Sequence, residues 1–423
     1  MNFAMMMRKQ SIGKWCTMKR TANDEKKPAK AVRDMLLAGK SAFHLPVVLG
    51  NDRDGKAMEC GLATAPNMFL FGEPWQGALP FLHSVICGLA ASRSPEDVRF
   101  ILIDPRFTEL APYAKLPNLM VPIINDRRRI IYGMRWAESE MESRLKMFSR
   151  VMVRNIEEFN SRDRNAPVSD MLGDDTPAAD VPDSMPYIVI VINGFDKDMA
   201  KEIKPCIQHL AAKGRVVGIH LILAADRVDK WVLPDVLKVN IPFRVAFKTA
   251  SAKDSKLILD EAGAESLNGT GDALVKCPDG IVRHVQTPSI SAAEIDAIVA
   301  DCVKSHSKKV SERRDYRTAY KIVVKTQRAS TSHLQRRMGI GYNHAAALID
   351  ELEANGVIGP QEGAMPRKVL VDSLPPPNMA EMEMTIRIPF EDLEDLRQLA
   401  RDKGCEVDDI ASEFIREHLK KLV

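Results

Sequence analysis

Short apolar runs alternate with amphipathic stretches over a first region that spans residues 31–303. The stretches between the runs, such as Ile130–Phe148 and Ala200–Lys213, carry apolar residues at helical spacing. The runs have strand length and polar edges, and they comprise Met68–Phe71, Phe100–Ile103, Tyr187–Ile192, His220–Ala224 and Arg244–Phe247. Alternation of strands with helices favours a mostly parallel sheet covered by helices, so the pattern predicts an α/β fold.

The pattern changes after this region. A charged segment without apolar periodicity is typical of a linker, and it leads into three helical stretches followed by two short strand candidates. A stiff SLPPP break comes next, and the chain closes with one alternating strand candidate and two helical stretches. The predicted organisation is a flexible basic arm at 1–30, an α/β body at 31–303, a linker at 304–315, a helical unit at 316–372, a Pro-rich linker at 373–381 and a tail at 382–423.

Composition narrows the class of protein only in part. The chain has 423 residues, of which 45% are hydrophobic and 28% are charged, with a net charge of +3. Any nucleic-acid-binding surface must therefore come from local clustering of basic residues. The seven cysteines are scattered and never form a CxxC pair, which favours reduced thiols in a cytoplasmic protein and predicts no metal site. No apolar run reaches the ~20 residues of a membrane helix.

The turn after Met68–Phe71 has the spacing of a phosphate-binding loop without its chemistry. It reads GEPWQGAL from Gly72 to Leu79, which keeps the Gly-x4-Gly spacing through Gly77. Such a loop needs a Lys for the β/γ-phosphates and a Ser or Thr for Mg²⁺, but Ala78 and Leu79 occupy those positions. Taken alone, this spacing also fits an ordinary strand–helix turn.

Longer segments resemble the FtsK/SpoIIIE family of DNA translocases over about Ala31–Asp372. The similar segments are EDVRF-x-x-IDP-x…EL at Glu96–Leu110, Trp136–Asn160, Met185–Val189, Gly218–Leu221, Asn240–Pro242 and Gly263–Leu267. The resemblance implies a RecA-like P-loop NTPase fold that assembles as a hexameric ring on double-stranded DNA and uses ATP. The family places a catalytic Asp-Glu pair where this chain has Asn193 and Gly194.

Four catalytic positions are thus changed together, namely Ala78, Leu79, Asn193 and Gly194. Loss of the phosphate lysine, the metal hydroxyl and both acids removes most of the electrostatic stabilisation that phosphoryl transfer requires. We therefore expect a pseudo-ATPase without a cofactor, with ATP and Mg²⁺ relevant only if the degenerate site still binds them. An active translocase with unusual motifs is the alternative.

Three basic residues of the body have two interpretations each. Asp226 replaces a sensor glutamine of the family, and Arg227 keeps the arginine that the family directs at a neighbouring subunit's nucleotide. Arg227 is either a surface arginine or a residue that acts in trans on an active partner, such as an intact FtsK-type translocase. Lys213 and Arg215 are candidates for pore-loop contacts with DNA, or a solvated helix end.

Residues 330–358 resemble the DNA-orienting winged-helix domain of the same family. Ser332–Met338 is predicted as the first helix of a helix-turn-helix, Gly339–Gly341 as its turn and Tyr342–Ala354 as the recognition helix. Asn343 either pairs with adenine or caps the helix. The family has arginine at His344 and Ala347, so guanine readout is weakened. The predicted DNA-binding residues are Gln335, Arg336, Arg337, Tyr342, Asn343, His344, Arg367 and Lys368, the last two from the wing.

The tail resembles a ribbon-helix-helix domain, in which two chains pair short strands that enter the major groove. Alternation points Thr385 and Arg387 toward DNA, and a unit this small is expected to dimerise. A dimerising helical hairpin without base contacts is the alternative. The whole pattern predicts a double-stranded DNA-binding protein with a degenerate motor, acting in chromosome or mobile-element segregation or transfer. A regulatory subunit that co-assembles with an intact translocase is a further alternative.

Overall fold

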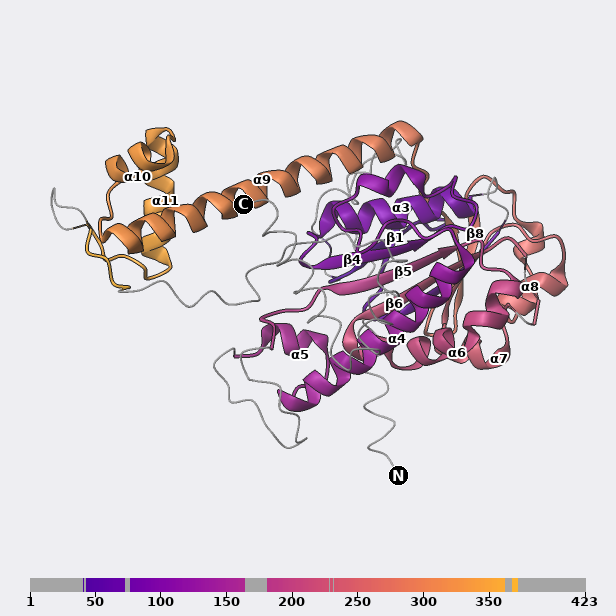
Figure 1. The fold of residues 1–423 in the computed structure, drawn as a ribbon. Helices are drawn as coiled ribbons and strands as arrows, with labels where there is room; N and C mark the ends of the chain where they lie inside the picture. Colours follow the sequence, from indigo (N-terminus) through magenta and orange to yellow (C-terminus); the bar gives the residue numbers. More distant parts are fainter. Residues whose placement is uncertain are drawn as a thin grey trace, which may run out of the picture. The chain divides into compact units, whose positions relative to one another are not determined.

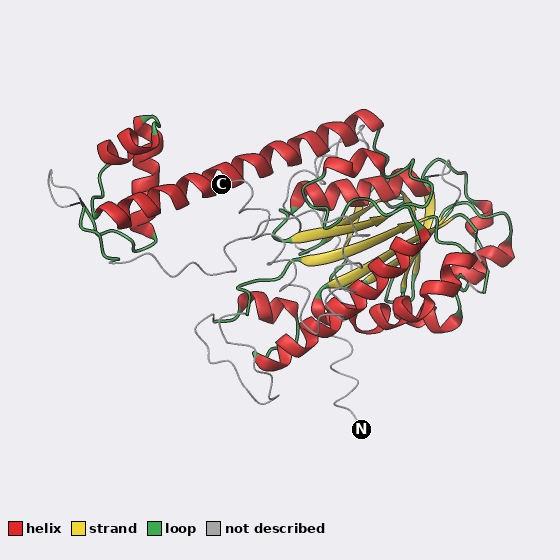
Figure 2. Ribbon diagram, in the orientation of Figure 1, coloured by secondary structure: helices red, strands yellow, loops and turns green. Residues whose placement is uncertain are grey.

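The computed structural model describes residues 41, 43–72, 77–163, 181–227, 229–230, 232–361 and 367–371. The strands within these residues are β1 (Pro46–Asn51), β2 (Ala57–Gly61), β3 (Asn67–Phe71), β4 (Val98–Ile103), β5 (Tyr187–Asn193), β6 (Ile219–Ala225), β7 (Phe243–Ala246), β8 (Asp272–Lys276) and β9 (Val282–Gln286). They form one nine-stranded sheet in the order β2-β1-β9-β8-β7-β3-β6-β5-β4. Helices lie on both faces of this sheet (Figures 1 and 2), which confirms the predicted α/β class.

The centre of the sheet is parallel. Strands β7, β3, β6, β5 and β4 pair in parallel, and each one overlaps one of the five apolar runs predicted as strands, although β7 ends one residue before Phe247. Burial explains why the runs are continuous, since every residue of β3, β6 and β7 is buried. Strand β3, which precedes the Gly-x4-Gly turn, lies between β7 and β6. After the turn the chain next enters the sheet at β4, which forms its edge, so β3 and β4 are not neighbours.

Antiparallel strands extend one edge of the sheet, and the apolar pattern did not predict them. Strands β8, β9, β1 and β2 follow β7 in antiparallel pairs. Strand β9 reads VRHVQ with one buried residue, so its apolar signal is diluted, whereas β1 reads PVVLGN and is largely buried. Gly50 has φ 123° and a Cβ there would lie 1.9 Å from the Gln286 carbonyl oxygen, which makes glycine necessary where β1 meets β9.

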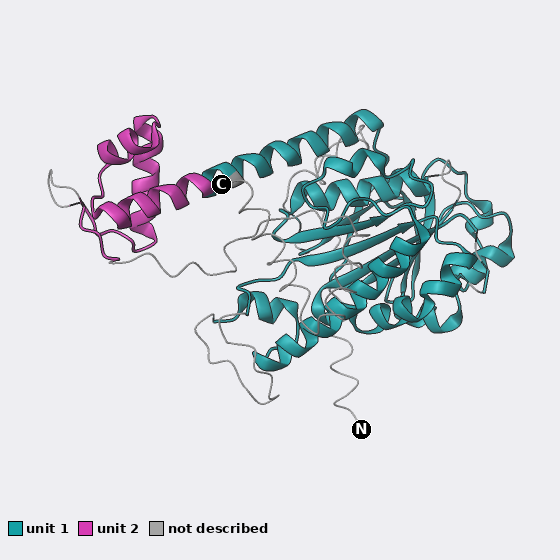
Figure 3. Ribbon diagram, viewed as in Figure 1, with its two compact units in different colours: residues 1–313 teal, residues 314–423 magenta. Residues whose placement is uncertain are grey.

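Helices cover the sheet and join the two compact units of the chain. The helices of the body are α3 (Ala78–Ser92), η2 (Ala111–Lys115), α4 (Arg127–Arg150), α5 (Ile156–Ser161), α6 (Lys197–Lys213), η4 (Gly214–Val217), α7 (Asp235–Asn240), α8 (Ala252–Leu259), η5 (Ala264–Ser266) and the first part of α9 (Ala292–Thr326). Figure 1 shows α3 on one face of the sheet and α4 and α6 on the other. The division between the two units falls after Arg313 (Figure 3), inside α9.

The segment predicted as a linker, residues 304–315, is helical and belongs to α9. It contains no glycine or proline, so nothing in its sequence ends a helix. Its charged residues have an i,i+4 contact between Lys308 and Glu312 at 3.8 Å. The division between the two units falls within this segment, after Arg313, and the expected break in secondary structure is absent there.

The second unit contains the end of α9, α10 (Thr331–Met338) and α11 (Tyr342–Ala354). Helix α11 begins and ends at the residues predicted for the recognition helix. Isolated antiparallel bridges join Ala329 to Arg367 and Ile358 to Val369, where the wing was expected. A separate hydrophobic core holds these parts together, and it includes Ala319, Val323, Leu334, Ala345, Leu348, Ile349, Leu352 and Ile358.

Several predictions from sequence concern residues outside the described ranges. The arm at 1–30, the Pro-rich linker at 373–381 and the ribbon-helix-helix-like tail with Thr385 and Arg387 lie there. Within the described ranges, no helix is both long and apolar enough to cross a membrane. The same part of the chain holds no cluster of three His, Cys, Asp or Glu residues suited to a metal ion.

Candidate nucleotide pocket and nucleic-acid interface

The carboxyl ends of β3, β5 and β6 meet around one small cavity. Most residues predicted for the vestigial nucleotide pocket are brought together in its wall, which includes Gly72, Ala78, Leu79, Asn193 and Gly194. The cavity has a volume of about 20 Å³. One water molecule needs roughly 10–15 Å³ of such space, whereas ligand sites occupy roughly 300–1,000 Å³. The cavity is partly open to solvent, and residues 73–76 of the turn lie outside the described residues, so the chemistry of the lining residues decides what it can bind.

The two glycines of the turn are required by packing. Gly72 has φ 155°, and a Cβ there would lie 2.6 Å from the Phe247 Cβ. Gly77 has φ 119°, and its Cβ would lie 2.7 Å from the backbone of Gly271. Both distances are below van der Waals contact, and both conformations strain any residue with a side chain. The Gly-x4-Gly spacing is thus explained by the strand–helix turn alone.

The N-terminus of α3 presents little to a phosphate. Gly77 is the N-cap residue and makes no side-chain cap hydrogen bond. Ala78 is buried, and Leu79 adds only a backbone N–H and an apolar side chain. Pro80, the third residue of the helix, has no N–H at all. The donors that normally make a helix N-terminus an anion site are therefore reduced here.

An ion pair lies across the rim of the cavity. Arg106, just after β4, donates a hydrogen bond from Nη2 to the Asp226 Oδ2 just after β6, at 2.7 Å. Both residues line the cavity, and the hydrogen bond from Arg106 to Asp226 raises the pKa of the guanidinium. Sequence reasoning noted Asp226 as a departure from the family but missed Arg106 as a site residue. Its place directly after a strand that ends at the carboxyl edge was the available signal.

The remaining basic candidates of the body lie apart from this cavity. Arg227 is exposed and makes no hydrogen bond or ion pair with another residue of the described ranges. Lys213 and Arg215 are also exposed, but they precede β6, whereas Asp226 follows it. Seven residues of strand separate the two ends of β6, a distance of roughly 20 Å. The pore-loop candidates and the cavity are therefore separate features.

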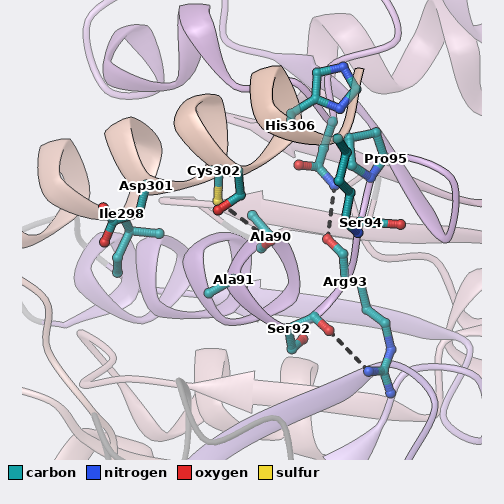
Figure 4. Close-up of a pocket in the computed structure, with 13 residues that line it drawn as sticks. Ala90, Ala91, Ser92, Arg93, Ser94, Pro95, Ile298, Asp301, Cys302 and His306 are labelled. Atoms are coloured by element: carbon teal, nitrogen blue, oxygen red, sulfur yellow. Dashed lines mark hydrogen bonds between the residues drawn. The ribbon is translucent and has the colours of Figure 1, made fainter. Parts of the chain in front are cut away.

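A larger cavity of about 390 Å³ lies between the end of α3 and α9, and none of the predicted site residues lines it (Figure 4). Several of its polar side chains are hydrogen-bonded within the fold, whereas the buried Nδ1 of His306 has no hydrogen-bond partner among the described residues. Arg93 donates from Nε to the His44 carbonyl at 2.6 Å, and Asn118 donates from Nδ2 to the Val98 carbonyl at 3.0 Å. Cys302 donates to the Ala90 carbonyl at 3.6 Å, which fastens α9 to α3.

The recognition helix α11 exposes the residues that were expected to face DNA. Tyr342, Asn343, His344, Ala347 and Asp350 are exposed. The opposite face of the helix, made by Ala345, Leu348, Ile349 and Leu352, is buried. The N-cap residue is Gly341 and the cap involves no side chain, so Asn343 does not cap this helix.

The wing residues have different surroundings. Lys368 is exposed. Arg367 is only 14% exposed, because its guanidinium pairs with Asp350 at 3.2 Å and with Glu353. Both carboxylates belong to α11, so Arg367 fastens the wing to the recognition helix. Its prediction as a phosphate contact stays untested, but its guanidinium is already committed.

A basic cluster lies beside the recognition helix. Arg336 and Arg337 on α10 are exposed, Gln335 is half-buried, and Arg328 just before α10 is exposed as well. Burial, and then the positive charges of Arg337, Arg328 and Arg336, lower the pKa of His333. The three arginines therefore share one region of positive potential. Sequence reasoning missed Arg328, which precedes the predicted helix.

Known protein families match both the body and the second unit of this chain. The FtsK/SpoIIIE family model matches residues 31–230, and the Ftsk gamma domain model matches residues 311–372. The DNA translocase FtsK of Chlamydia muridarum is 33% identical over 354 residues, covering 79% of this chain and 44% of the relative. That of Mycobacterium tuberculosis is 34% identical over 356 residues, covering 78% and 42%. The chain thus spans less than half the length of these relatives.

Solved structures share the fold at lower identity. The pCW3 conjugation coupling protein TcpA, in its monomer form with ATPgS, is 20% identical with a TM-score of 0.52, covering 64% of this chain and 73% of that one. The cytoplasmic domain of the Thermomonospora curvata Type VII secretion ATPase EccC is 20% identical with a TM-score of 0.50, covering 62% and 31%. The predicted RecA-like fold is therefore confirmed, and the chain belongs to the FtsK/SpoIIIE family.

Proposed function

We propose that this chain is a double-stranded DNA-binding member of its family whose body does not hydrolyse ATP. The observation that carries the proposal is the lining of this cavity, where Ala78, Leu79, Asn193 and Gly194 supply no charged group and Arg106 on the rim is paired with Asp226. The residues in its wall do not fit Mg²⁺ and a nucleoside triphosphate. A positive side chain for the phosphates, a hydroxyl for the metal and an acid for the attacking water are missing from the family's positions.

The residue types at the family's catalytic positions support the proposal. Ala78 and Leu79 replace the phosphate lysine and the metal hydroxyl, and Asn193 and Gly194 replace the two acids. Removing one electrostatic group from an active site typically lowers the rate ~10²-fold or more. Loss of several such groups leaves no part of the phosphoryl-transfer machinery at these positions.

The DNA-binding part of the proposal rests on the second unit. The region of Arg328, Arg336 and Arg337 offers three guanidinium groups to phosphates, beside a helix whose outward residues are exposed. The relatives are named DNA translocases, which favours duplex DNA as the partner. The family resemblance favours a ring or another self-assembly, and a role in moving or segregating chromosomal or mobile-element DNA.

The direct test is ATP turnover by the purified full chain at sub-micromolar concentration, with and without long duplex DNA. A mobility shift is measured in the same samples. We expect a DNA shift and no turnover. A parallel preparation of Arg336→Ala with Arg337→Ala controls for contaminating enzymes, because a contaminant's turnover would not respond to a change in this chain. DNA-stimulated turnover that falls in this variant would overturn the proposal and favour an active translocase.

Arg227 supports a second candidate, a subunit that co-assembles with an intact translocase. It is exposed directly after Asp226, at the position where the family resemblance directs an arginine at a neighbouring subunit's nucleotide. In a mixture with an intact FtsK-type translocase, we expect Arg227→Ala to remove any change that this chain causes in the partner's ATP turnover. Lys230→Ala, which removes a nearby exposed charge, is the matched control. Equal effects of the two variants would exclude a specific role for Arg227.

A further inference from the structure

The outward row of the recognition helix contains no positive charge. Residues of an α-helix are offset by about 100° each, so the row opposite the buried face of α11 contains Asn343, Ala347, Asp350 and Ala354. His344 lies to one side of this row, with its Nε2 3.5 Å from the Asp315 carboxylate. Helix α11 has neither lysine nor arginine along its length. Recognition of guanine in the major groove is mainly the task of those two residues.

Asp350, the acidic residue of this row, is already paired with an arginine. The Asp350 carboxylate accepts a hydrogen bond from the Arg367 Nη2 at 3.2 Å, and Arg367 is largely buried against the helix. The wing guanidinium neutralises this carboxylate and holds it toward the wing. Since the N-terminal residues of a recognition helix contact base edges, the first two turns remain for readout, which leaves Asn343 and Ala347.

These two side chains match one kind of base pair. The amide of Asn343 is exposed and does not cap the helix, so both its donor and its acceptor are available. An amide of this kind pairs with the N6 and N7 atoms of adenine, and an alanine methyl packs on the thymine methyl. Asn343 and Ala347 are four residues apart, about 6 Å along the helix, which is close to two base-pair steps.

We infer that Asn343 reads adenine and Ala347 reads the methyl group of thymine, so the second unit prefers duplex with A·T pairs about two base-pair steps apart. This inference rests on the proposed DNA binding. The arginines near α10 supply affinity through phosphates that carry no sequence information, and the outward row of α11 supplies the preference. The structure thus separates the two tasks between two helices of one unit.

The test uses the full chain and a pool of short duplexes randomised in sequence, from which bound DNA is recovered and sequenced. We expect enrichment of adenine and thymine at two positions about two base-pair steps apart, roughly 5- to 150-fold over other bases. Asn343→Ala should abolish the adenine enrichment, and Ala347→Arg should replace thymine by guanine at its position. Both residues are exposed, so these variants keep the fold, which circular dichroism checks.

Arg336→Ala is the matched control, because it should reduce total recovery without changing which bases are enriched. Recovery of DNA with no base enrichment would overturn the inference and leave DNA binding intact. Enrichment that is unchanged in Asn343→Ala would overturn it as well, since another residue would then read the bases. Absence of any recovered DNA would overturn the proposed function, and the inference with it.

Discussion

The body and the second unit both keep the packing of their motifs, but they differ in the side chains that their candidate functional positions carry. In the body, Gly72 and Gly77 hold a turn against Phe247 and Gly271, while the positions that carried charge are apolar or neutral. In the second unit, the buried face of α11 is intact and its outward residues remain exposed. The spacing of a motif can therefore be required by packing alone, so it is weak evidence for catalytic chemistry. Exposed residues that have no role in packing are more direct evidence for function.

The largest expected effect tests whether packing explains the retained glycines. Gly77→Ala places a Cβ 2.7 Å from the Gly271 backbone in a strained conformation, and should lower the stability of the body by about 2–4 kcal/mol. Urea unfolding followed by tryptophan fluorescence measures it, since the four tryptophans all precede residue 232. Gly194→Ala is the matched control, because φ is 83° but no atom lies within 4 Å of its Cβ. Equal losses in the two variants would show that strain, and not close approach, dominates.

The next effect tests the basic cluster of the second unit. Arg336→Ala with Arg337→Ala should weaken DNA binding about tenfold or more at moderate salt, and reduce the slope of log affinity against log salt by about 2. Fluorescence anisotropy over a salt series measures both quantities. Lys304→Ala with Lys308→Ala removes the same charge from the exposed part of α9 in the first unit. An unchanged slope in the arginine variant would assign the phosphate contacts to other residues.

A smaller effect shows that the body still uses charge for folding. Asp260 follows α8 and pairs with Lys276 at 2.7 Å, Arg244 at 2.9 Å and Lys238 at 3.1 Å. Partial burial alone would raise the pKa of Asp260, but the hydrogen bonds from these three cations lower it. Because Asp260 is 45% exposed, we expect Asp260→Asn to cost only about 1 kcal/mol near neutral pH.

The pH dependence of that loss follows from the direction of the pKa shift. The folded-state pKa of Asp260 lies below its ordinary value of 3.8, so its stabilisation is complete above that value. It is lost as the pH falls through the folded-state pKa. Urea midpoints of the two proteins should therefore converge at strongly acidic pH, and a constant difference down to that range would contradict the assignment.

The smallest effect concerns the ion pair at the cavity. Asp226→Gln restores the family residue and breaks the contact with Arg106, whose side chain is 54% exposed. Pairs this exposed contribute about 0–1 kcal/mol, so stability should change little. Nucleotide binding should stay absent, because the wall of the cavity is unchanged; calorimetric titration with ATP measures it. Binding that appears in this variant alone would mean that the pair, and not the wall, excludes nucleotide.

The parallel strands could be predicted because burial on both faces leaves an unbroken apolar run, as in Tyr187–Ile192. The antiparallel strands could not, because half-exposed strands such as β9 admit arginine and histidine. Helix α11 was predicted to the residue because glycines mark both of its ends. The Arg106–Asp226 pair joins residues that are 120 apart in sequence, so only the order of the strands in the sheet shows that the two side chains meet.

The lining of the cavity also has a practical consequence for chemical biology. Affinity resins and reactive probes built on a purine triphosphate select proteins by the groups that hold its phosphates and metal ion. On the proposed function, a site with Ala78 and Leu79 at those positions offers none, so this chain should pass through an ATP resin that retains ATPases of the same fold. Compounds that compete with ATP should likewise spare it, and an inhibitor of this protein would have to be sought at its DNA-facing arginines.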